Sequence, residues 1–184
     1  MGSVGQIIGL AAIAAFMSVM PAAGGKLKVG DKAPDFTLPS ASKDTILQAG
    51  ISLSSLTGGK AVILAFYPAD WSGGCTKEMC TIRDNFDALG ATVIGISGDY
   101  ASSHMKWAKE LGLKFILLSD HYHKVARMYD SFDEKSGFNR RTVYVIDRSG
   151  TIAYVDMAYN AGSPESFAKL KEALQTIHEG HRIP

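Results

Sequence analysis

Two cysteines, Cys75 and Cys80, are the residues of this chain best suited to chemistry. They are its only cysteines, and they lie in one short stretch. A secreted disulfide scaffold would spread more cysteines over a smaller chain, and a structural zinc site needs four ligands. His121 and His123 form an isolated H-x-H beside Asp120, which we interpret as a solvated turn and not a metal site. The two thiols are therefore a candidate redox pair, and we expect no metal.

The residues before Cys75 are suited to keeping its thiol ionised. Gly73 and Gly74 precede it at the expected start of a helix, where free backbone N–H groups and the helix dipole stabilise an anion. The thiolate is the nucleophilic form of cysteine. Ser72 adds a hydroxyl near the sulfur, and Pro68 stiffens and shields the approach. An inert buried thiol beside a capping serine is the simpler interpretation, and the second cysteine argues against it.

The five-residue spacing limits what the two thiols can do together. On an intact helix their Cα atoms would lie roughly 8–9 Å apart, from the rise and radius of an α-helix. A disulfide needs a Cα separation of roughly 4.4–6.8 Å. A bond between Cys75 and Cys80 therefore requires the helix to unwind over at least its first turn. The spacing also differs from C-x-x-C, which argues against thioredoxin-type exchange.

Apolar patterns predict the elements that position this pair. The continuous apolar run 61–67 predicts a buried central strand, and Cys75–Leu89 has the spacing of an amphipathic helix. Strands are also predicted at 92–97, 115–118, 141–147 and 151–157, an extended segment at 28–38, and helices at 102–111, 123–129 and 163–177. Ser102 or Ser103 and Ser163 are the expected helix caps. This order predicts an α/β fold with a mixed central sheet flanked by helices.

Length and charge favour one domain without a polyanion partner. The chain has 184 residues and a formal charge of +1, and it contains no long basic run. These properties argue against nucleic-acid binding. We expect residues 26–184 to form the domain and residues 1–25 to form an apolar leader.

The leader has the length of a signal-peptide core or a short membrane anchor. Residues 4–23 carry no charge, and the first positive charges, Lys26 and Lys28, follow the apolar run. A standard signal peptide would carry such a charge before it. The alternative is an apolar helix packed on the protein or on a partner subunit. We favour an exported, periplasmic or membrane-associated location over a cytoplasmic one.

The stretch Tyr67-Pro-Ala-Asp-Trp-Ser-Gly-Gly-Cys75 resembles the peroxiredoxin signature P-x-x-x-(T/S)-x-x-C, with Pro68, Ser72 and Cys75 in its three fixed places. Cys75-Thr-Lys-Glu-Met-Cys80 is similar to the Q-type subfamily, also called bacterioferritin comigratory protein. The resemblance runs from about residue 29 to residue 177. Ser72 stands where threonine is commoner, and Trp71-Ser-Gly-Gly74 departs from the subfamily's usual Thr-Pro-Gly.

The resemblance implies a thioredoxin-like fold and a division of roles among the candidate residues. Cys75 would attack a hydroperoxide, and Cys80 would resolve the resulting sulfenic acid as a disulfide. Arg141 falls where the family keeps its active-site arginine, and Glu78 matches a carboxylate often paired with that arginine. Gly73, Gly74 and Tyr67 are expected to line or support the substrate pocket.

The implied substrates are hydrogen peroxide and organic hydroperoxides, with thioredoxin or a similar dithiol as reductant. No cofactor is expected, and relatives include monomers and homodimers. Two rival functions are a thioredoxin-like disulfide exchange protein and a copper chaperone that uses two cysteines and a distal histidine. The first normally needs C-x-x-C, and the cysteines of the second sit closer together than Cys75 and Cys80.

Overall fold

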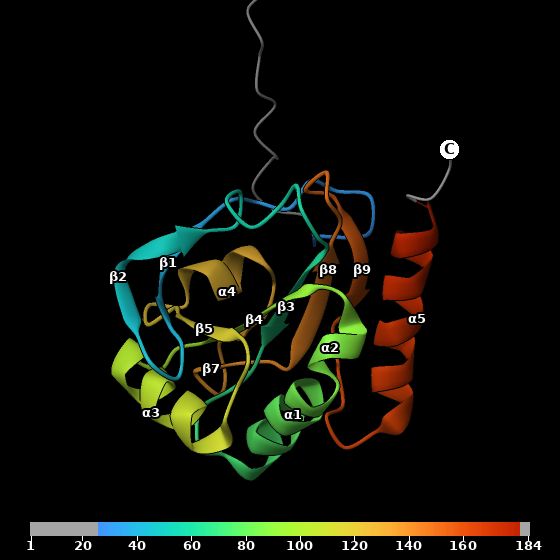
Figure 1. Ribbon diagram of the computed structural model, residues 1–184. Coiled ribbons are helices and arrows are strands. Elements are labelled where there is room, and N and C mark those ends of the chain that lie inside the picture. Colours follow the sequence, from blue (N-terminus) through green and yellow to red (C-terminus); the bar gives the residue numbers. More distant parts are fainter. Residues whose placement is uncertain (1–25, 181–184) are drawn as a thin grey trace, which may run out of the picture.

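A seven-stranded mixed β-sheet forms the centre of the protein (Figure 1), and β6 (Phe132–Asp133) and β7 (Phe138–Asn139) form a separate two-stranded sheet. The computed structural model describes residues 26–180. The strands of the large sheet are β1 (Thr37–Ala41), β2 (Ile46–Ser52), β3 (Val62–Phe66), β4 (Thr92–Ser97), β5 (Ile116–Ser119), β8 (Thr142–Ile146) and β9 (Ile152–Asp156). The helices are α1 (Gly73–Asp84), α2 (Phe86–Leu89), α3 (Ala101–Leu111), α4 (Lys124–Met128) and α5 (Pro164–Gly180).

The strand order in the large sheet is β2-β1-β5-β4-β3-β8-β9. Strands β3, β4 and β5 run parallel, whereas β8 pairs antiparallel with β3. The β3–β8 register places Phe66 opposite Thr142. The end of β3 and the start of β8 therefore meet at the same edge of the sheet, although many residues separate them in sequence.

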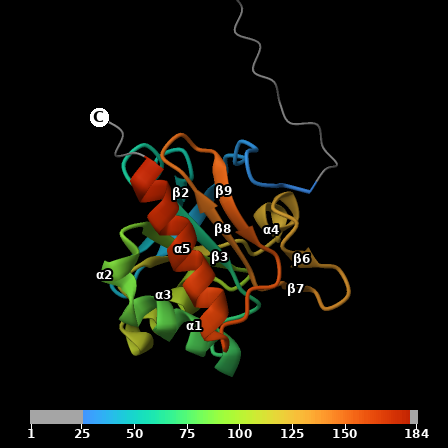
Figure 2. The same ribbon diagram turned by 90° about the vertical axis from the view of Figure 1, so that its right-hand side faces the viewer.

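Alternating residues of the central strands build a core on each face of the sheet. Ile63 and Ala65 of β3 face one cluster, which also receives Met79 of α1, Trp107 of α3 and Leu170 of α5. The even-numbered residues of β3 face a second cluster, which includes Val125 and Ala126 of α4. Figure 2 shows α1, α3 and α5 on one side of the sheet and α4 on the other. Because both faces are covered, β3 is apolar throughout, and β4, β5 and β8 are mainly apolar.

The predicted long helix at 75–89 is in fact two helices. The first begins at Gly73, two residues before Cys75, and the chain breaks at Asn85 before α2. The Asn85 side-chain amide donates to the carbonyl oxygen of Thr81 at 2.9 Å. A side chain that bonds the backbone in this way competes with the regular helical ladder, which explains the break.

The predicted serine cap of α3 is wrong. This helix begins at Ala101 after Tyr100, whose side chain makes no capping bond. Ser103 instead donates its hydroxyl proton to Asp70 at 2.8 Å. At α5 the expected cap is confirmed, because Ser163 Oγ accepts from the N–H of Glu165 at 3.2 Å. That helix continues to Gly180, slightly beyond the predicted end.

The strand at 92–97 is confirmed at both ends, and those at 61–67, 115–118, 141–147 and 151–157 are confirmed within a residue. The segment 28–38 contributes only the start of β1, which continues through Pro39. The pairing of β1 with β2 shifts register between Leu38 and Ser40. Proline has no N–H for the ladder, so an irregularity here is expected. Strands β2, β6 and β7 were not predicted from the sequence.

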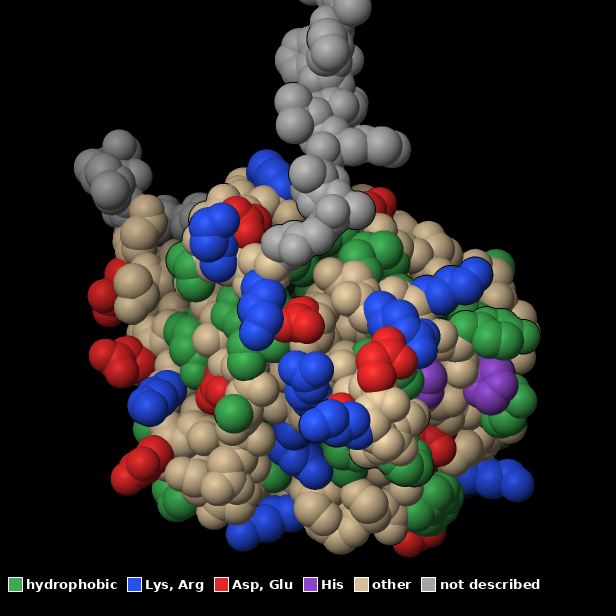
Figure 3. Space-filling model, turned by 180° about the vertical axis from the view of Figure 1, so that it is seen from behind, with side chains coloured by type: hydrophobic (Ala, Val, Ile, Leu, Met, Phe, Trp, Pro, Cys, Tyr) green, Lys and Arg blue, Asp and Glu red, His purple; other side chains and the backbone are tan. Residues whose placement is uncertain are grey.

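The apolar leader predicted at 1–25 lies outside the described residues. Among residues 26–180, no helix is long and apolar enough to cross a membrane. On the face seen from behind, acidic and basic side chains are intermixed (Figure 3).

Candidate active site

The loop between β3 and α1 places Cys75 in the first turn of the helix. Ser72 is the N-terminal cap, and its hydroxyl oxygen accepts from the N–H of Cys75 at 3.3 Å. The cap carbonyl also accepts from the N–H of Thr76 at 2.8 Å. Cys75 is fully buried, and its thiol is free. The sulfur therefore lies at the positive end of the α1 dipole, where a thiolate is stabilised.

Strand pairing in the sheet brings Arg141 close to Cys75. This arginine immediately precedes β8, whose pairing with β3 brings it beside the loop that carries Cys75. Its Nη2 donates to Cys75 Sγ at 3.4 Å, across 66 residues of sequence. The Arg141 side chain is 19% exposed. Partial burial opposes charge on Arg141, but Glu78 and Cys75 together raise its pKa above the ordinary value.

Glu78 lies one helical turn after Cys75 and forms an ion pair with Arg141 Nη1 through Oε2. Burial raises the pKa of Glu78 to about 7, against the opposing effect of the Arg141 charge. Its second oxygen, Oε1, accepts no hydrogen bond from residues 26–180. Glu78 therefore holds one branch of the guanidinium while the other branch contacts the sulfur.

The two glycines before Cys75 differ in what surrounds them. A Cβ on Gly74 would lie 3.2 Å from Arg141 Nη2, whereas a Cβ on Gly73 would meet nothing within 4 Å. Of the two positions, an added side chain would therefore press on Arg141 only at position 74. Both glycines are exposed at this end of α1, whereas Cys75, which follows them, is buried.

Pro68 and Tyr67 flank the site at the end of β3. Pro68 is half-buried where the strand stops. Tyr67 is fully buried beside Trp107, and its hydroxyl donates to Asp70 at 2.8 Å. This hydrogen bond engages the Tyr67 hydroxyl within the protein, so Tyr67 supports the site from inside and does not offer its hydroxyl to a substrate.

Cys80 is half-buried near the middle of α1, and its thiol is also free. Both cysteines therefore lie on one intact helix. A bond between them would require the helix to unwind, as the spacing predicts.

Sequence reasoning missed three buried polar residues around the site: Asp70, His104 and Tyr159. The carboxylate of Asp70 meets His104 Nδ1 at 2.9 Å. The N–H of Tyr159 donates to the Arg141 carbonyl at 3.0 Å, which fixes the backbone of the arginine. A signal for His104 existed, because it lies three residues before Trp107 and four before Ala108 on one buried helix face.

The two histidines of the H-x-H pair have separate partners. His123 is half-buried, and its Nδ1 lies 2.8 Å from Asn139 Oδ1, so it is less solvated than expected. The exposed His121 ring stacks on Tyr100 at 4.1 Å between centroids. No group of three or more His, Cys, Asp or Glu side chains suited to a metal occurs within the described part of the chain.

Comparison with known proteins places these features in a family. Residues 29–155 match the model of the AhpC/TSA family. A chloroplastic peroxiredoxin Q of Triticum aestivum is 42% identical over 138 residues, which cover 71% of this chain. The match spans 59% of the length of that relative and of two from Oryza sativa.

Solved structures share the fold. Peroxidoxin BcpB of Mycobacterium tuberculosis is 31% identical, with a TM-score of 0.71, and the match covers 82% of this chain and 98% of that one. AhpC of Enterococcus faecalis is 25% identical, with a TM-score of 0.71, and the match covers 85% and 97%. The thioredoxin-like α/β fold is thereby confirmed, and the chain belongs to the AhpC/TSA family, the family of the peroxiredoxins.

Proposed function

We propose that this protein is a thiol peroxidase that uses Cys75 as its nucleophile. The observation that carries the proposal is the contact of Arg141 Nη2 with Cys75 Sγ at 3.4 Å, at the N-terminus of α1. A guanidinium and a helix N-terminus both favour the thiolate. The same guanidinium can stabilise the negative charge that develops on a peroxide oxygen. Hydrogen peroxide and organic hydroperoxides are the proposed substrates.

In the first step the Cys75 thiolate attacks one peroxide oxygen, and the O–O bond breaks. The leaving oxygen departs as hydroxide or alkoxide and takes up a proton, which gives water or an alcohol. Cys75 becomes a sulfenic acid. Ser72 Oγ accepts from the Cys75 amide and donates no hydrogen bond to any residue between 26 and 180, so its proton is available to the peroxide. Glu78 keeps Arg141 in place through its ion pair.

In the second step Cys80 resolves the sulfenic acid. The first turns of α1 unwind, the Cys80 thiolate attacks the Cys75 sulfur, and the hydroxyl leaves as water. An intramolecular disulfide results. An external dithiol, thioredoxin or a similar protein, then reduces this disulfide by exchange. The chain itself supplies both thiols, and no step needs a cofactor.

Two cysteine variants test the cycle. Cys75→Ser should abolish peroxide consumption in a coupled thioredoxin assay, because no other thiol lies beside Arg141. Cys80→Ser should still form a sulfenic acid, detected by trapping and intact-mass measurement, but should lose turnover with thioredoxin. Activity that survives in Cys75→Ser would refute the peroxidase assignment. Normal turnover of Cys80→Ser would refute only the resolving role of Cys80.

A further inference from the structure

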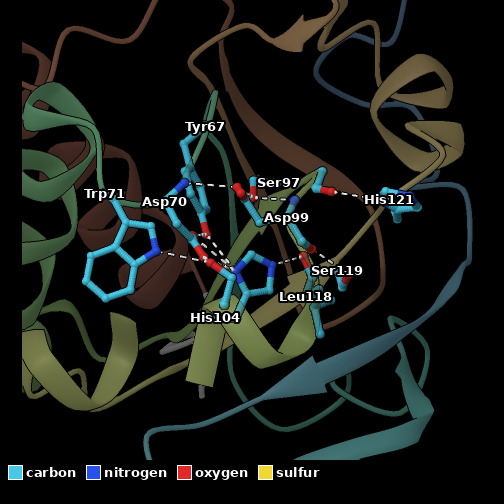
Figure 4. A network of polar contacts seen from close by, with 11 residues as sticks. Tyr67, Asp70, Trp71, Ser97, Asp99, His104, Leu118, Ser119 and His121 are labelled. Carbon is cyan, nitrogen blue, oxygen red and sulfur yellow. Dashed lines mark hydrogen bonds and ion pairs between the residues drawn. The ribbon is translucent and has the colours of Figure 1, made fainter. Parts of the chain in front are cut away.

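A buried polar network surrounds the loop that precedes Cys75 (Figure 4). Its centre is the Asp70 carboxylate, which accepts from Tyr67 Oη and from Ser103 Oγ, each at 2.8 Å. The same carboxylate lies 2.9 Å from Nδ1 of His104 in α3. The side chains of Asp70 and His104 are both inaccessible to solvent. Every oxygen of this carboxylate is therefore engaged inside the protein.

The second ring nitrogen of His104 also faces an acceptor. Nε2 lies 3.2 Å from the carbonyl oxygen of Leu118 in β5. A carbonyl oxygen only accepts, and the Asp70 carboxylate already accepts from two hydroxyls. Both ring nitrogens of His104 therefore face acceptors, an arrangement that suits an N–H on each nitrogen, as in an imidazolium opposite a carboxylate. A buried ion pair repays its desolvation only with complete hydrogen bonding, as here, and its use is often to define one arrangement and not to add stability.

The network holds the two residues immediately before the helix cap. The N–H of Asp70 donates to Asp99 Oδ2 at 2.9 Å, and Trp71 Nε1 donates to Ser103 Oγ at 3.1 Å. Trp71 has φ of 64°, a left-handed conformation that a non-glycine residue adopts only where its surroundings impose it. Ser72, which caps α1 and meets the Cys75 amide, follows directly.

The partners of the ion pair do not include α1. They lie at the end of β3, after β4, in α3 and in β5, at Tyr67, Asp99, Ser103 and Leu118. Unwinding of α1 would therefore break none of these bonds. The loop can stay in place while the helix opens.

We propose that the Asp70–His104 ion pair is a positioning element for the attack of Cys75 on peroxide, and that it stays formed while α1 unwinds for disulfide formation. The inference rests on the proposed peroxidase function. Neither residue touches the sulfur, so both act through the loop and Ser72. Loss of the pair should slow the oxidation of Cys75, and it should leave the later disulfide step nearly unchanged.

Stopped-flow fluorescence measures the two steps separately. In His104→Leu, we expect the second-order rate constant with hydrogen peroxide to fall about tenfold or more, because small misplacements of reacting groups are costly. The first-order rate constant of disulfide formation should stay within about twofold of the wild-type value. His104→Gln, whose amide can still donate to Asp70, should recover part of the loss. Asp70→Asn keeps the shape of the side chain and removes its charge. If His104→Leu does not fold, this variant should show the slower peroxide step and the unchanged disulfide step instead.

Ile152→Ala is the matched control, because Ile152 is a buried core residue on the other face of the sheet. Once matched to His104→Leu by urea midpoint, it should leave the peroxide step within about twofold of wild type. An unchanged peroxide step in His104→Leu and Asp70→Asn would overturn the proposal. An equal decrease in the rate constants of both steps would also overturn it. So would a slower peroxide step with an unchanged disulfide step in Ile152→Ala.

Hydrogen exchange separates this proposal from the proposed function. It is measured on the reduced protein without peroxide, at the amides of residues 71–76. Exchange there should be faster in His104→Leu than in wild type, and not faster in Ile152→Ala. Equal exchange would overturn the positioning role even in an active enzyme. A wild-type protein that consumes no peroxide would refute the proposed function, whatever the exchange rates show.

Discussion

Replacing Glu78 by glutamine should remove a specific pH dependence of stability. Glu78 is 1% exposed, and burial raises its pKa from an ordinary value of 4.5 to about 7 despite the nearby Arg141 charge. Between these values the folded protein retains a proton that the unfolded chain has lost. The free energy of unfolding therefore falls as the pH rises through this interval. At about 1.36 kcal/mol per pH unit, the loss is about 3 kcal/mol.

Glutamine does not titrate, so the Glu78→Gln variant should lack this component. The assay is urea unfolding of the reduced protein, repeated across the interval from pH 4.5 to 7 for both proteins. The difference in unfolding free energy, wild type minus variant, should fall by about 3 kcal/mol across it. The control is Glu110→Gln, at an exposed position of α3, where the difference from wild type should stay flat. A constant difference for Glu78→Gln would refute the raised pKa and the burial argument behind it.

Two further predictions concern Arg141. In Arg141→Lys, the second-order rate constant of Cys75 oxidation should fall by about 10²–10³-fold. The reason is that an ammonium group cannot replace the forked contact with Glu78 and the sulfur. A rate constant within tenfold of wild type, measured by stopped flow, would contradict this. In Gly74→Ala, the new Cβ lies 3.2 Å from Arg141 Nη2, so oxidation should slow while the circular dichroism spectrum is unchanged. Gly59→Ala is its control, because an added Cβ there meets nothing within 4 Å. Equal rates in the two alanine variants would show that Arg141 adjusts freely.

Much of the fold follows from local pattern. The strand at 92–97 and the apolar strand β3 are visible as short β-branched runs, and α5 is visible from its serine–proline start. The break at Asn85 was missed because it depends on one side chain bonding the Thr81 carbonyl, which hydrophobic spacing does not reveal. Strand β2 was missed because five of its seven residues are small or polar or exposed, so its alternation is weak.

The candidate site likewise contains some residues that the sequence identifies and others that only the fold brings together. Ser72, Gly74 and Cys75 lie within one turn of sequence, so a cap and a helix start can be recognised from spacing alone. Asp70 and His104 could not be paired in this way. Ser102 or Ser103 was expected to cap the helix that follows, whereas the fold places Ser103 beside Asp70. A local cap rule fails there because the long-range acceptor is available only after α3 packs against the loop.

The sequence by itself determined the chemistry that is local: two thiols five positions apart, a helix start at the first, and a geometry that forbids their bond while the helix is intact. Only the tertiary structure decided which charges meet those thiols. Arg141 contacts Cys75 across 66 residues because β8 pairs with β3 in one register, and His104 meets Asp70 because α3 packs beside the loop. Helical spacing acts between near neighbours, whereas strand register and helix packing are collective results of burying both faces of one sheet.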